Sequence, residues 1–356
     1  EVPSEEAVLC AAAYKKLGDQ LDDASKRDLK DAVHDGKLTW NAPEAGWLVA
    51  AVTVQPNDLD YLNRAVADRW LEVSLHAYEE HLPNFVGNTL KAYGPDEMYV
   101  LRGNILFSSS VLDRIKKERG YDPVPHLVGL FHDVGKMTDK IRCDYYDVMV
   151  SVLEENFYRP LAQWLHERGM LYTTIATWGR EDILSQTYHY GDFFRMMRHF
   201  DVTGNEDPHL TEVGERRLID AKLSSSVAHL YGRSRVAVCV YWGAGWGQSQ
   251  EQNLAWTNEN YAYGINLYNC HGVLYSTMGG WYEWVPPDVH FRQPYWQNWK
   301  AFTDYIRRLS YVMSQGRHAA DVAILYPITT VHANWSQGGR FSSAADEAAN
   351  TTLSLA

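Results

Sequence analysis

The stretch RVAVCVYWGAGWGQSQEQNLAWTNENYAYGINLYNCHG, residues 235–272, decides the fold class. Its first eight and its last eight residues are short, largely apolar runs, each of which predicts a buried strand. Between them a glycine-rich turn leads into residues 250–264, which predict a helix. Short apolar strands that alternate with helices are typical of a parallel α/β fold.

The same alternation extends over most of the chain. The sequence predicts further strands at residues 46–54, 89–97, 170–177 and 321–327. It predicts further helices at residues 61–82, 108–120, 144–169, 215–232 and 294–316. No GxGxxG motif and no P-loop motif follows any of these strands, so a dinucleotide-binding or P-loop fold has no support. A (β/α)8 TIM-type barrel is the better interpretation.

The predicted barrel is incomplete and covers residues 46–332. Residues 1–45 look like an irregular excursion of the barrel domain that includes a hairpin, and residues 333–356 look like a loose or truncated tail. Because fewer than eight strands are predicted, we expect a piece of a longer polypeptide. The chain also begins with Glu1 rather than Met, as expected after processing or truncation.

Composition narrows the classes of partner. The 356 residues carry a net charge of -12 with no basic stripe, which disfavours a nucleic-acid partner. No apolar run reaches the length of a membrane span, and the four cysteines lack the CxxC spacing of a zinc site. The 13 tryptophans suit stacking on the apolar faces of sugars as well as core packing. Oligomeric state and compartment stay open, with a secreted or periplasmic location slightly favoured.

The site of such a barrel is expected at the carboxyl ends of its strands. Candidate catalytic residues there are Glu97 and Glu283, because paired carboxylates supply the acid and the base of glycoside hydrolysis. Candidate substrate-binding residues are Asp96, His189, Asp192, Trp242, Trp246, His271, Tyr275, Trp281 and Trp284. Carboxylates with an aromatic rim on an acidic protein indicate a carbohydrate substrate.

Each candidate also has a purely structural interpretation. Asp96 and Glu97 would serve as a helix cap or lie in a solvated loop, and Glu283 would pair with Arg292 at the surface. The tryptophans would be core residues, and His271 would be a structural histidine. Asp201, Glu206 and Asp207 in FDVTGNED would belong to a polar loop.

A second motif points to another class of enzyme. GLFHDVGKMTDK, residues 129–140, contains the His-Asp pair that binds metal in HD phosphohydrolases. A metal centre needs three or more converging ligands. The nearest upstream histidine, His126, precedes this stretch. It lies six positions before His132 and directly after a proline, where a helical ligand is not expected. The HD interpretation is therefore the weaker one.

Several long motifs carry a family resemblance. They include LTWNAPEAGWLVAAVTV, FVGNTLKAYGPDE, RGYDPVPHLVGLFHDVG, SSVAHLYGRSRVAV, GAGWG and YSTMGGWYEWVPP. With these motifs in order from about residue 1 to residue 332, the chain resembles the α-L-rhamnosidase-like glycoside hydrolases of family 106.

The resemblance implies inverting hydrolysis of a glycoside, with barrel sequence missing upstream and β-rich domains downstream. It implies that Glu97 is the general acid. A second glutamate of the family pattern is replaced here by Cys239, and a thiol is a poor substitute for a carboxylate base. The resemblance also implies calcium, without indicating its ligands in this chain.

The leading hypothesis is a glycosidase acting on a deoxyhexose such as α-L-rhamnose in a polysaccharide or glycoconjugate. Glu283 is the best remaining partner for Glu97, at roughly the 6.5–9.5 Å separation of an inverting pair. The alternatives are a sugar-binding relative that lost its base at Cys239, and the HD phosphohydrolase.

Overall fold

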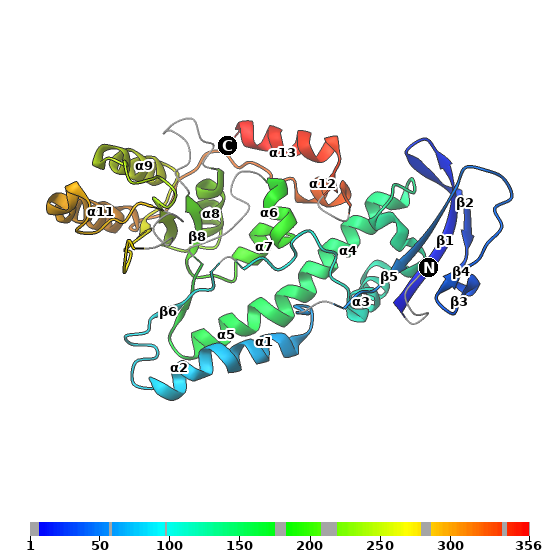
Figure 1. Ribbon diagram of the computed structural model, residues 1–356, viewed down its shortest axis with the longest axis horizontal. Coiled ribbons are helices and arrows are strands. Elements are labelled where there is room, and N and C mark those ends of the chain that lie inside the picture. The colour runs from blue at the N-terminus through cyan, green and yellow to red at the C-terminus, as the bar shows by residue number, and fades with distance from the viewer. Residues whose placement is uncertain are drawn as a thin grey trace. The chain divides into compact units, whose positions relative to one another are not determined.

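The computed structural model describes residues 7–56, 59–96, 98–174, 183–207, 219–278, 286–336 and 340–355. The chain forms two compact units (Figure 1). Unit 1 comprises Glu1–Trp70, Leu101–Tyr158 and Tyr326–Thr351, and unit 2 comprises Leu71–Val100, Arg159–Leu325 and Thr352–Ala356.

Unit 1 contains an antiparallel sheet of order β2-β1-β5 (Figure 1). Its strands are β1 (Val8–Leu17), β2 (Gln20–Asp28) and β5 (Trp47–Thr53). A short hairpin, β3 (Val33–His34) with β4 (Lys37–Leu38), turns at Asp35 and Gly36, which both adopt positive φ as this type of turn requires. Small alanine side chains of β1 pack with Leu29 and Val33 to form a core on one face of the sheet.

The helices of unit 1 are α1 (Arg64–Trp70), α3 (Ser109–Arg119), α4 (Met137–Leu153), the 3-10 turns η2 (Lys30–Ala32) and η4 (Val124–Leu130), the π-turn η5 (Glu154–Tyr158), α12 (Ile328–Ala333) and most of α13 (Ser343–Leu355). Of these, α3, η4 and α12 pack against α4, η5 continues α4, α1 packs against η5, and η2 lies beside β1. Between α12 and α13 lies a small hairpin, β11 (Trp335–Ser336) with β12 (Arg340–Phe341). Trp335 is fully buried and stacks on Tyr146 of α4, with ring centroids 4.4 Å apart.

Unit 2 contains parallel strands that neighbour one another in chain order. They are β6 (Ala92–Tyr93), β7 (Leu171–Tyr172), β8 (Thr203–Asp207), β9 (Val236–Val240) and β10 (Leu267–Cys270). β6 pairs with β7, and β9 lies between β8 and β10. A parallel bridge between Thr173 and Val202 connects the two groups. Among the described residues these strands form an open series, without a closing pair.

The helices of unit 2 are η3 (Leu71–Leu75), α2 (His76–His81), α5 (Arg159–Glu167), α6 (Ile183–Tyr190), α7 (Phe193–Met197), α8 (Ile219–Leu230), α9 (Gln250–Ala262), η6 (Pro294–Asn298) and α11 (Trp299–Met313). Of these, α5 packs beside β7, α8 packs beside β8 and β9, and α9 and α11 pack against one face of β9. Alternate residues of β9, Val236, Val238 and Val240, pack against Trp256 of α9 and Phe302 of α11. The opposite face of β9 is therefore the one that is left for a site.

Most of the predicted helices are confirmed. Ser108 caps α3 through its side chain, and Gly120 ends it in the left-handed conformation, as the sequence predicts. The predicted helix at residues 144–169 starts earlier, at Met137, and contains a π-turn directly before Arg159 and Pro160, where a kink is predicted.

One predicted strand is absent, one lies in a different sheet from the one expected, and two strands were not predicted. Residues 321–327 form no strand, and Val322 and Leu325 are strongly exposed, because the segment makes no ladder hydrogen bonds. The strand predicted at residues 46–54 is β5, which pairs antiparallel with β1 and does not join the parallel series. Residues 8–28, predicted to be irregular, form β1 and β2, since their alanine-rich composition hides a strand that packs closely.

The remaining terminal segment is ordered within the described residues. Residues 333–356 were predicted to be a loose or truncated tail, and they contain the buried Trp335 and α13. The architecture is a mixed α/β fold with a parallel series of strands in unit 2 and an antiparallel sheet in unit 1.

Candidate functional site

Three side chains form a row across the carboxyl half of the parallel strands. In the β8–β9 register Glu206 is the direct partner of Cys239, and in the β9–β10 register Cys239 is the direct partner of Asn269. Direct partners on neighbouring strands point to the same face of a sheet. The alternate residues Val238 and Val240 pack against α9 and α11, so Glu206, Cys239 and Asn269 point to the opposite face of the strands.

Cys239 is buried among negative charges. Its side chain is 6% exposed, and burial raises the pKa of the thiol to about 12, with further contributions from the charges of Glu206 and Asp96. The thiol is therefore protonated near neutral pH and can act neither as a nucleophile nor as a general base. The influence of Asp96 also shows that the turn after β6 approaches the end of β9.

A glycine makes this approach possible. A Cβ atom on Gly94, two residues before Asp96, would lie 2.5 Å from Thr173 Oγ1 and 2.7 Å from the Thr173 carbonyl oxygen. Only glycine allows the ends of β6 and β7 to come this close. The chain then turns at the buried Pro95 and presents Asp96 as an exposed carboxylate at the carboxyl edge of the strands.

His271 follows β10 and completes this edge. Burial lowers the pKa of its imidazole, although the charge of Asp96 acts in the opposite direction. The ring is half-buried, and its Nδ1 atom has no hydrogen-bond partner among the described residues. A neutral histidine next to a carboxylate can donate a hydrogen bond to a polar ligand or accept one from it.

The backbone at the end of β9 is strained. Tyr241 adopts a φ of 76°, which is unusual for a residue other than glycine, and is held there by full burial and a 2.6 Å hydrogen bond to Thr257 Oγ1. Such conformations cluster at functional sites, where the surrounding structure compensates for the strain. The strain marks the point at which β9 leads into Trp242.

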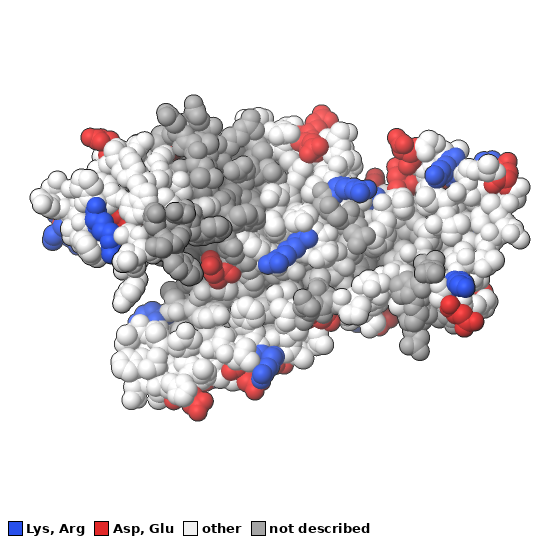
Figure 2. Space-filling view, viewed as in Figure 1, with Lys and Arg blue, Asp and Glu red and all other residues white. Residues whose placement is uncertain are grey.

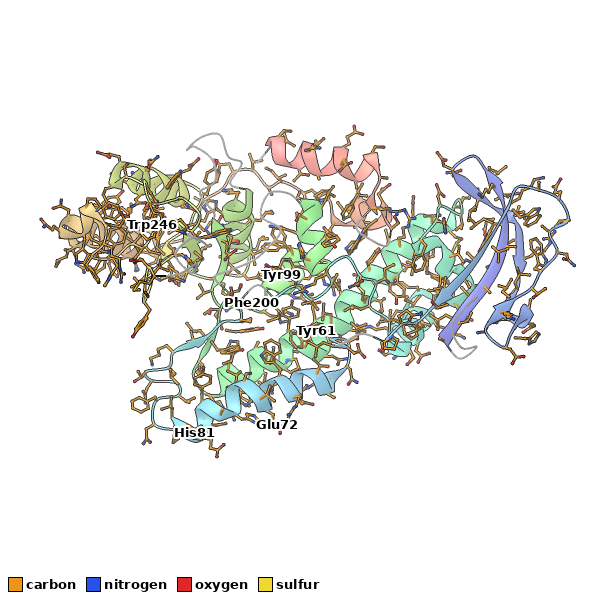
Figure 3. All side chains as sticks on the ribbon, in the orientation of Figure 1. Tyr61, Glu72, His81, Tyr99, Phe200 and Trp246 are labelled. Atoms are coloured by element: carbon orange, nitrogen blue, oxygen red, sulfur yellow. The ribbon has the colours of Figure 1, made fainter. Side chains whose placement is uncertain are left out.

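His189 and Asp192 have clear local roles. The ring of His189 in α6 lies 5.0 Å from the ring of Tyr99, which follows Asp96 in the chain; Figure 3 labels Tyr99. This contact places His189 beside the loop after β6. Asp192 is 7% exposed and caps α7 by accepting a hydrogen bond from the backbone N–H of Arg195.

Three of the predicted aromatic residues are described. Trp242 is partly buried at the end of β9, and Trp246, labelled in Figure 3, is 39% exposed in the segment that leads to α9. Tyr275 is fully exposed. These exposures are compatible with stacking on a sugar, and binding by these rings stays a prediction.

Comparison with known proteins identifies the family. A family model described as alpha-L-rhamnosidase matches residues 19–337. The chain belongs to glycoside hydrolase family 106. The structure resembles that of the rhamnosidase from Novosphingobium sp. PP1Y with a TM-score of 0.64 and 23% identity, over 85% of this chain and 31% of that one.

A curated protein of Formosa agariphila named "Putative beta-glucuronidase" is 23% identical over 312 residues, which is 81% of this chain and 26% of that protein. The chain thus spans between a quarter and a third of the length of these relatives. The resemblance to family 106 that the motifs carry is confirmed, and the activity of the family is taken up below as a proposal.

Several positions that the family resemblance singles out are not described. Glu97, Glu283, Trp281 and Trp284 lie outside the described residues. Among the described residues nearby, Arg292 pairs with the buried Asp288 at 2.7 Å and donates to the Leu274 carbonyl oxygen at 3.2 Å. Arg292, suggested as the surface partner of Glu283, thus has Asp288 as a partner.

Glu206 is the residue of this edge that sequence reasoning missed. Its surroundings, VTGNED, are rich in polar residues and glycine and were assigned to a polar loop. The structure places Thr203–Asp207 in β8. Residues 202–207 show no alternation of apolar and polar residues, so the local sequence does not distinguish a strand from a loop.

The neighbouring acid Asp201 has a structural role. Its carboxylate lies 2.7 Å from His166 Nε2 and 3.1 Å from an Arg233 guanidinium nitrogen, and it also accepts a hydrogen bond from the backbone of Tyr172. Asp201 precedes β8, at the end of the strands opposite to the row of Glu206 and Cys239. Phe200, labelled in Figure 3, stacks on Tyr172 beside it.

The His-Asp motif of unit 1 also has a structural explanation. Asp133 accepts hydrogen bonds from Gln20, Gly135 and Thr138 at the start of α4. Burial alone would raise the pKa of this carboxyl, and the hydrogen bonds lower it overall. Burial lowers the pKa of His132, with contributions from Arg142 and Lys16.

Among the described residues, no group of three or more histidine, cysteine, aspartate or glutamate side chains could hold a metal ion. The calcium that the resemblance implies is not assigned to any ligands here. Within the same residues, no helix combines the length and apolar composition needed to cross a membrane. On the face shown in Figure 2, lysine and arginine side chains are interspersed with aspartate and glutamate.

Proposed function

We propose that the protein is a glycosidase that hydrolyses an α-L-rhamnoside or a related deoxyhexose glycoside in a polysaccharide or glycoconjugate. The observation that carries the proposal is the family match over residues 19–337. The carboxylates of Asp96 and Glu206 support it, because both lie at the carboxyl edge of parallel strands, where enzymes of this architecture hold their catalytic groups.

The parallel strands of unit 2 are proposed to be part of a (β/α)8 barrel. β6 to β10 neighbour one another in chain order and have helices on one face, as consecutive staves of such a barrel do. Residues 46–332 remain the proposed extent of the catalytic barrel domain. β5 pairs elsewhere, so within that range the described staves begin at β6.

The proposed reaction proceeds with inversion. Glu97, one residue after Asp96, protonates the glycosidic oxygen as the bond from this oxygen to the anomeric carbon breaks. A carboxylate on the other side of the ring removes a proton from the attacking water, whose oxygen forms the new bond to that carbon. Glu206 is the proposed base because it lies beside Cys239, and Glu283 is the second candidate.

The proposed sugar site includes polar groups and aromatic rings. Asp96, His189 and His271 surround the edge of the strands and would bind hydroxyl groups. Asp192 acts through the backbone of α7, which it caps, and therefore positions this edge. The aromatic residues proposed to stack on the sugar are Trp242, Trp246, Tyr275, Trp281 and Trp284.

The test is hydrolysis of an aryl α-L-rhamnoside, with an aryl β-glucuronide in parallel because one relative carries that name. Glu97→Gln and Glu206→Gln are each expected to lower kcat by about a hundredfold or more, as the loss of an acid or base does. Glu283→Gln distinguishes the two candidate bases. Glu251→Gln, an exposed change at the start of α9, is the matched control. Full activity of both Glu97→Gln and Glu206→Gln would remove them from the mechanism.

One observation favours a second candidate function, a sugar-binding protein without turnover. The buried Cys239, with a pKa of about 12, stands where the family pattern has a glutamate. In that case the folded protein binds rhamnose in calorimetry and hydrolyses neither substrate, and Cys239→Glu creates activity. Rapid turnover by the unmodified protein excludes this alternative.

A further inference from the structure

A cavity lies at the amino ends of β9 and β10. Its volume is about 700 Å³, and its walls include Val236 at the start of β9 and Asn266 just before β10. Residues of α8, the last residues of α9 and α11, and the segments that follow these three helices form the rest of the wall. Cys239 and His271 mark the other end of these strands, so the cavity is separate from the site proposed for hydrolysis.

The cavity is lined by cations. Lys222, His229, Arg233, Arg317 and His318 contribute to its wall, and no aspartate or glutamate does among the described residues. In the same described part of the chain neither Lys222 nor Arg317 forms an ion pair, and Arg233 pairs with Asp201 at 3.1 Å. In a chain with a net charge of -12, a cavity without acidic groups is an unexpected local concentration of positive charge.

Two of these groups are in direct contact. The rings of His229 and His318 stack with centroids 4.0 Å apart and an interplanar angle of 5°. Burial, together with the charges of His318 and Lys222, lowers the pKa of His229 to about 4. Five groups that are or can become positive thus lie around one cavity, without a negative charge among its lining residues.

Helix ends offer an alternative explanation for the cations. The carboxyl end of a helix carries a partial negative charge that favours lysine, arginine and histidine. Here the exposed carbonyl groups have other partners: the backbone N–H of Arg233 donates to Ala228 of α8, and the side-chain amide of Asn266 donates to Met313 of α11. These carbonyl groups therefore do not depend on the cationic side chains as caps, and Lys222 and Arg317, which form no ion pair among the described residues, are available to a ligand.

We propose that this cavity is a second binding site, which takes a small molecule that carries a phosphate or sulfate ester. Lysine and arginine bind such oxyanions through charge-assisted hydrogen bonds. The volume lies within the range of small-molecule sites, about 300–1,000 Å³, and exceeds what a bare anion needs. Tyr261, Ser234 and Ser314 supply an aromatic ring and hydroxyl groups, which suit a saccharide attached to the ester.

The test is isothermal titration calorimetry of the protein with glucose 6-phosphate, glucose 6-sulfate, inorganic phosphate and glucose. The first two are expected to bind, with the tighter one identifying the preferred ester, and glucose is expected not to bind. The double variant Lys222→Gln/Arg317→Gln should lose about tenfold or more in affinity, as the removal of charge-assisted contacts implies.

The matched control is Lys300→Gln/Arg307→Gln, which removes the same charge from exposed positions of α11 outside the cavity. Its affinity is expected to stay within about twofold of the unmodified protein, and circular dichroism checks that both double variants are folded. The proposal is overturned if neither ester binds the unmodified protein, if glucose binds as tightly as its esters, or if both double variants lose affinity equally. Hydrolysis of rhamnosides does not bear on these outcomes.

Discussion

Glu206 on β8 and Cys239 on β9 lie side by side on the same face of the strands, as direct partners in the parallel register. Burial is the main cause of the raised pKa of the thiol, and the negative charge of Glu206 adds to this effect. The pair keeps a carboxylate at this edge beside the cysteine that the family resemblance is expected to place at a glutamate position. It also makes the thiol a reporter of the charge in the proposed active site.

Cys239 is expected to resist alkylation in the folded protein. Since its pKa is about 12, few molecules carry the reactive thiolate at pH 8, and burial also blocks access. Iodoacetamide followed by peptide mass spectrometry should modify it at least about a hundredfold more slowly than in guanidinium. Glu206→Gln removes a negative charge that disfavours the thiolate of Cys239, so it should increase the rate of alkylation at a given pH. Glu251→Gln should leave this rate unchanged. Equal rates in the folded and unfolded states would contradict the burial.

Trp335→Ala should strongly destabilise unit 1. The fully buried ring stacks on Tyr146, and the removal of a buried tryptophan typically costs about 3–5 kcal/mol. The measurement is the free energy of unfolding from urea denaturation. Leu17→Ala, at a position that is 59% exposed in the same unit, is the control and should change it by about 0.5 kcal/mol or less. A similarly small change for Trp335→Ala would mean that the segment around it is not packed.

Gly94→Ala should disturb the approach of β6 to β7. The added methyl group would lie 2.7 Å from the backbone oxygen of Thr173, which cannot rotate away, so a cost of about 1–3 kcal/mol is expected. Gly247→Ala is the matched control, because a Cβ atom there meets nothing within 4 Å. Thermal unfolding of the two variants decides the matter, and equal melting temperatures would contradict the close contact.

Stability should fall as the pH falls from about 6.5 towards about 4, in part because of His229. The unfolded chain binds a proton on this histidine below about 6.5, whereas the folded chain, with a pKa of about 4, does not. The loss is therefore absent above the unfolded pKa and complete below the folded one. The groups that face the ring are His318 and Lys222, with Arg233 and Arg317 in the same cavity.

The experiment compares urea denaturation of the unmodified protein and His229→Gln at pH 7, 6, 5 and 4.5. As the pH falls, the unfolding free energy of the unmodified protein should decrease more than that of His229→Gln. Other groups titrate in both proteins and cancel in this difference. A difference that is constant with pH would show that His229 titrates alike in the folded and unfolded states.

The sequence by itself determined the α/β class, the family and most of the helices. Local signals are sufficient for a helix such as α3, whose serine cap and terminal glycine are read from neighbouring residues. The strand β9 was found because a fully buried strand is a continuous apolar run. The quoted motifs indicated the family because they preserve long runs of side chains in order.

Only the tertiary structure decided which strands pair and which charged residues meet. The apolar segment at residues 321–327 has the composition of a strand but pairs with no other strand among the described residues. The segment that includes Glu206 has the composition of a loop, and it forms a strand because it pairs with β9. Strand pairing depends on hydrogen bonds between residues far apart in the sequence, so local composition cannot fix it. For the same reason the positions of Asp96 and Glu206 beside Cys239, and of His229 against His318, follow from the register of the strands and the packing of the helices.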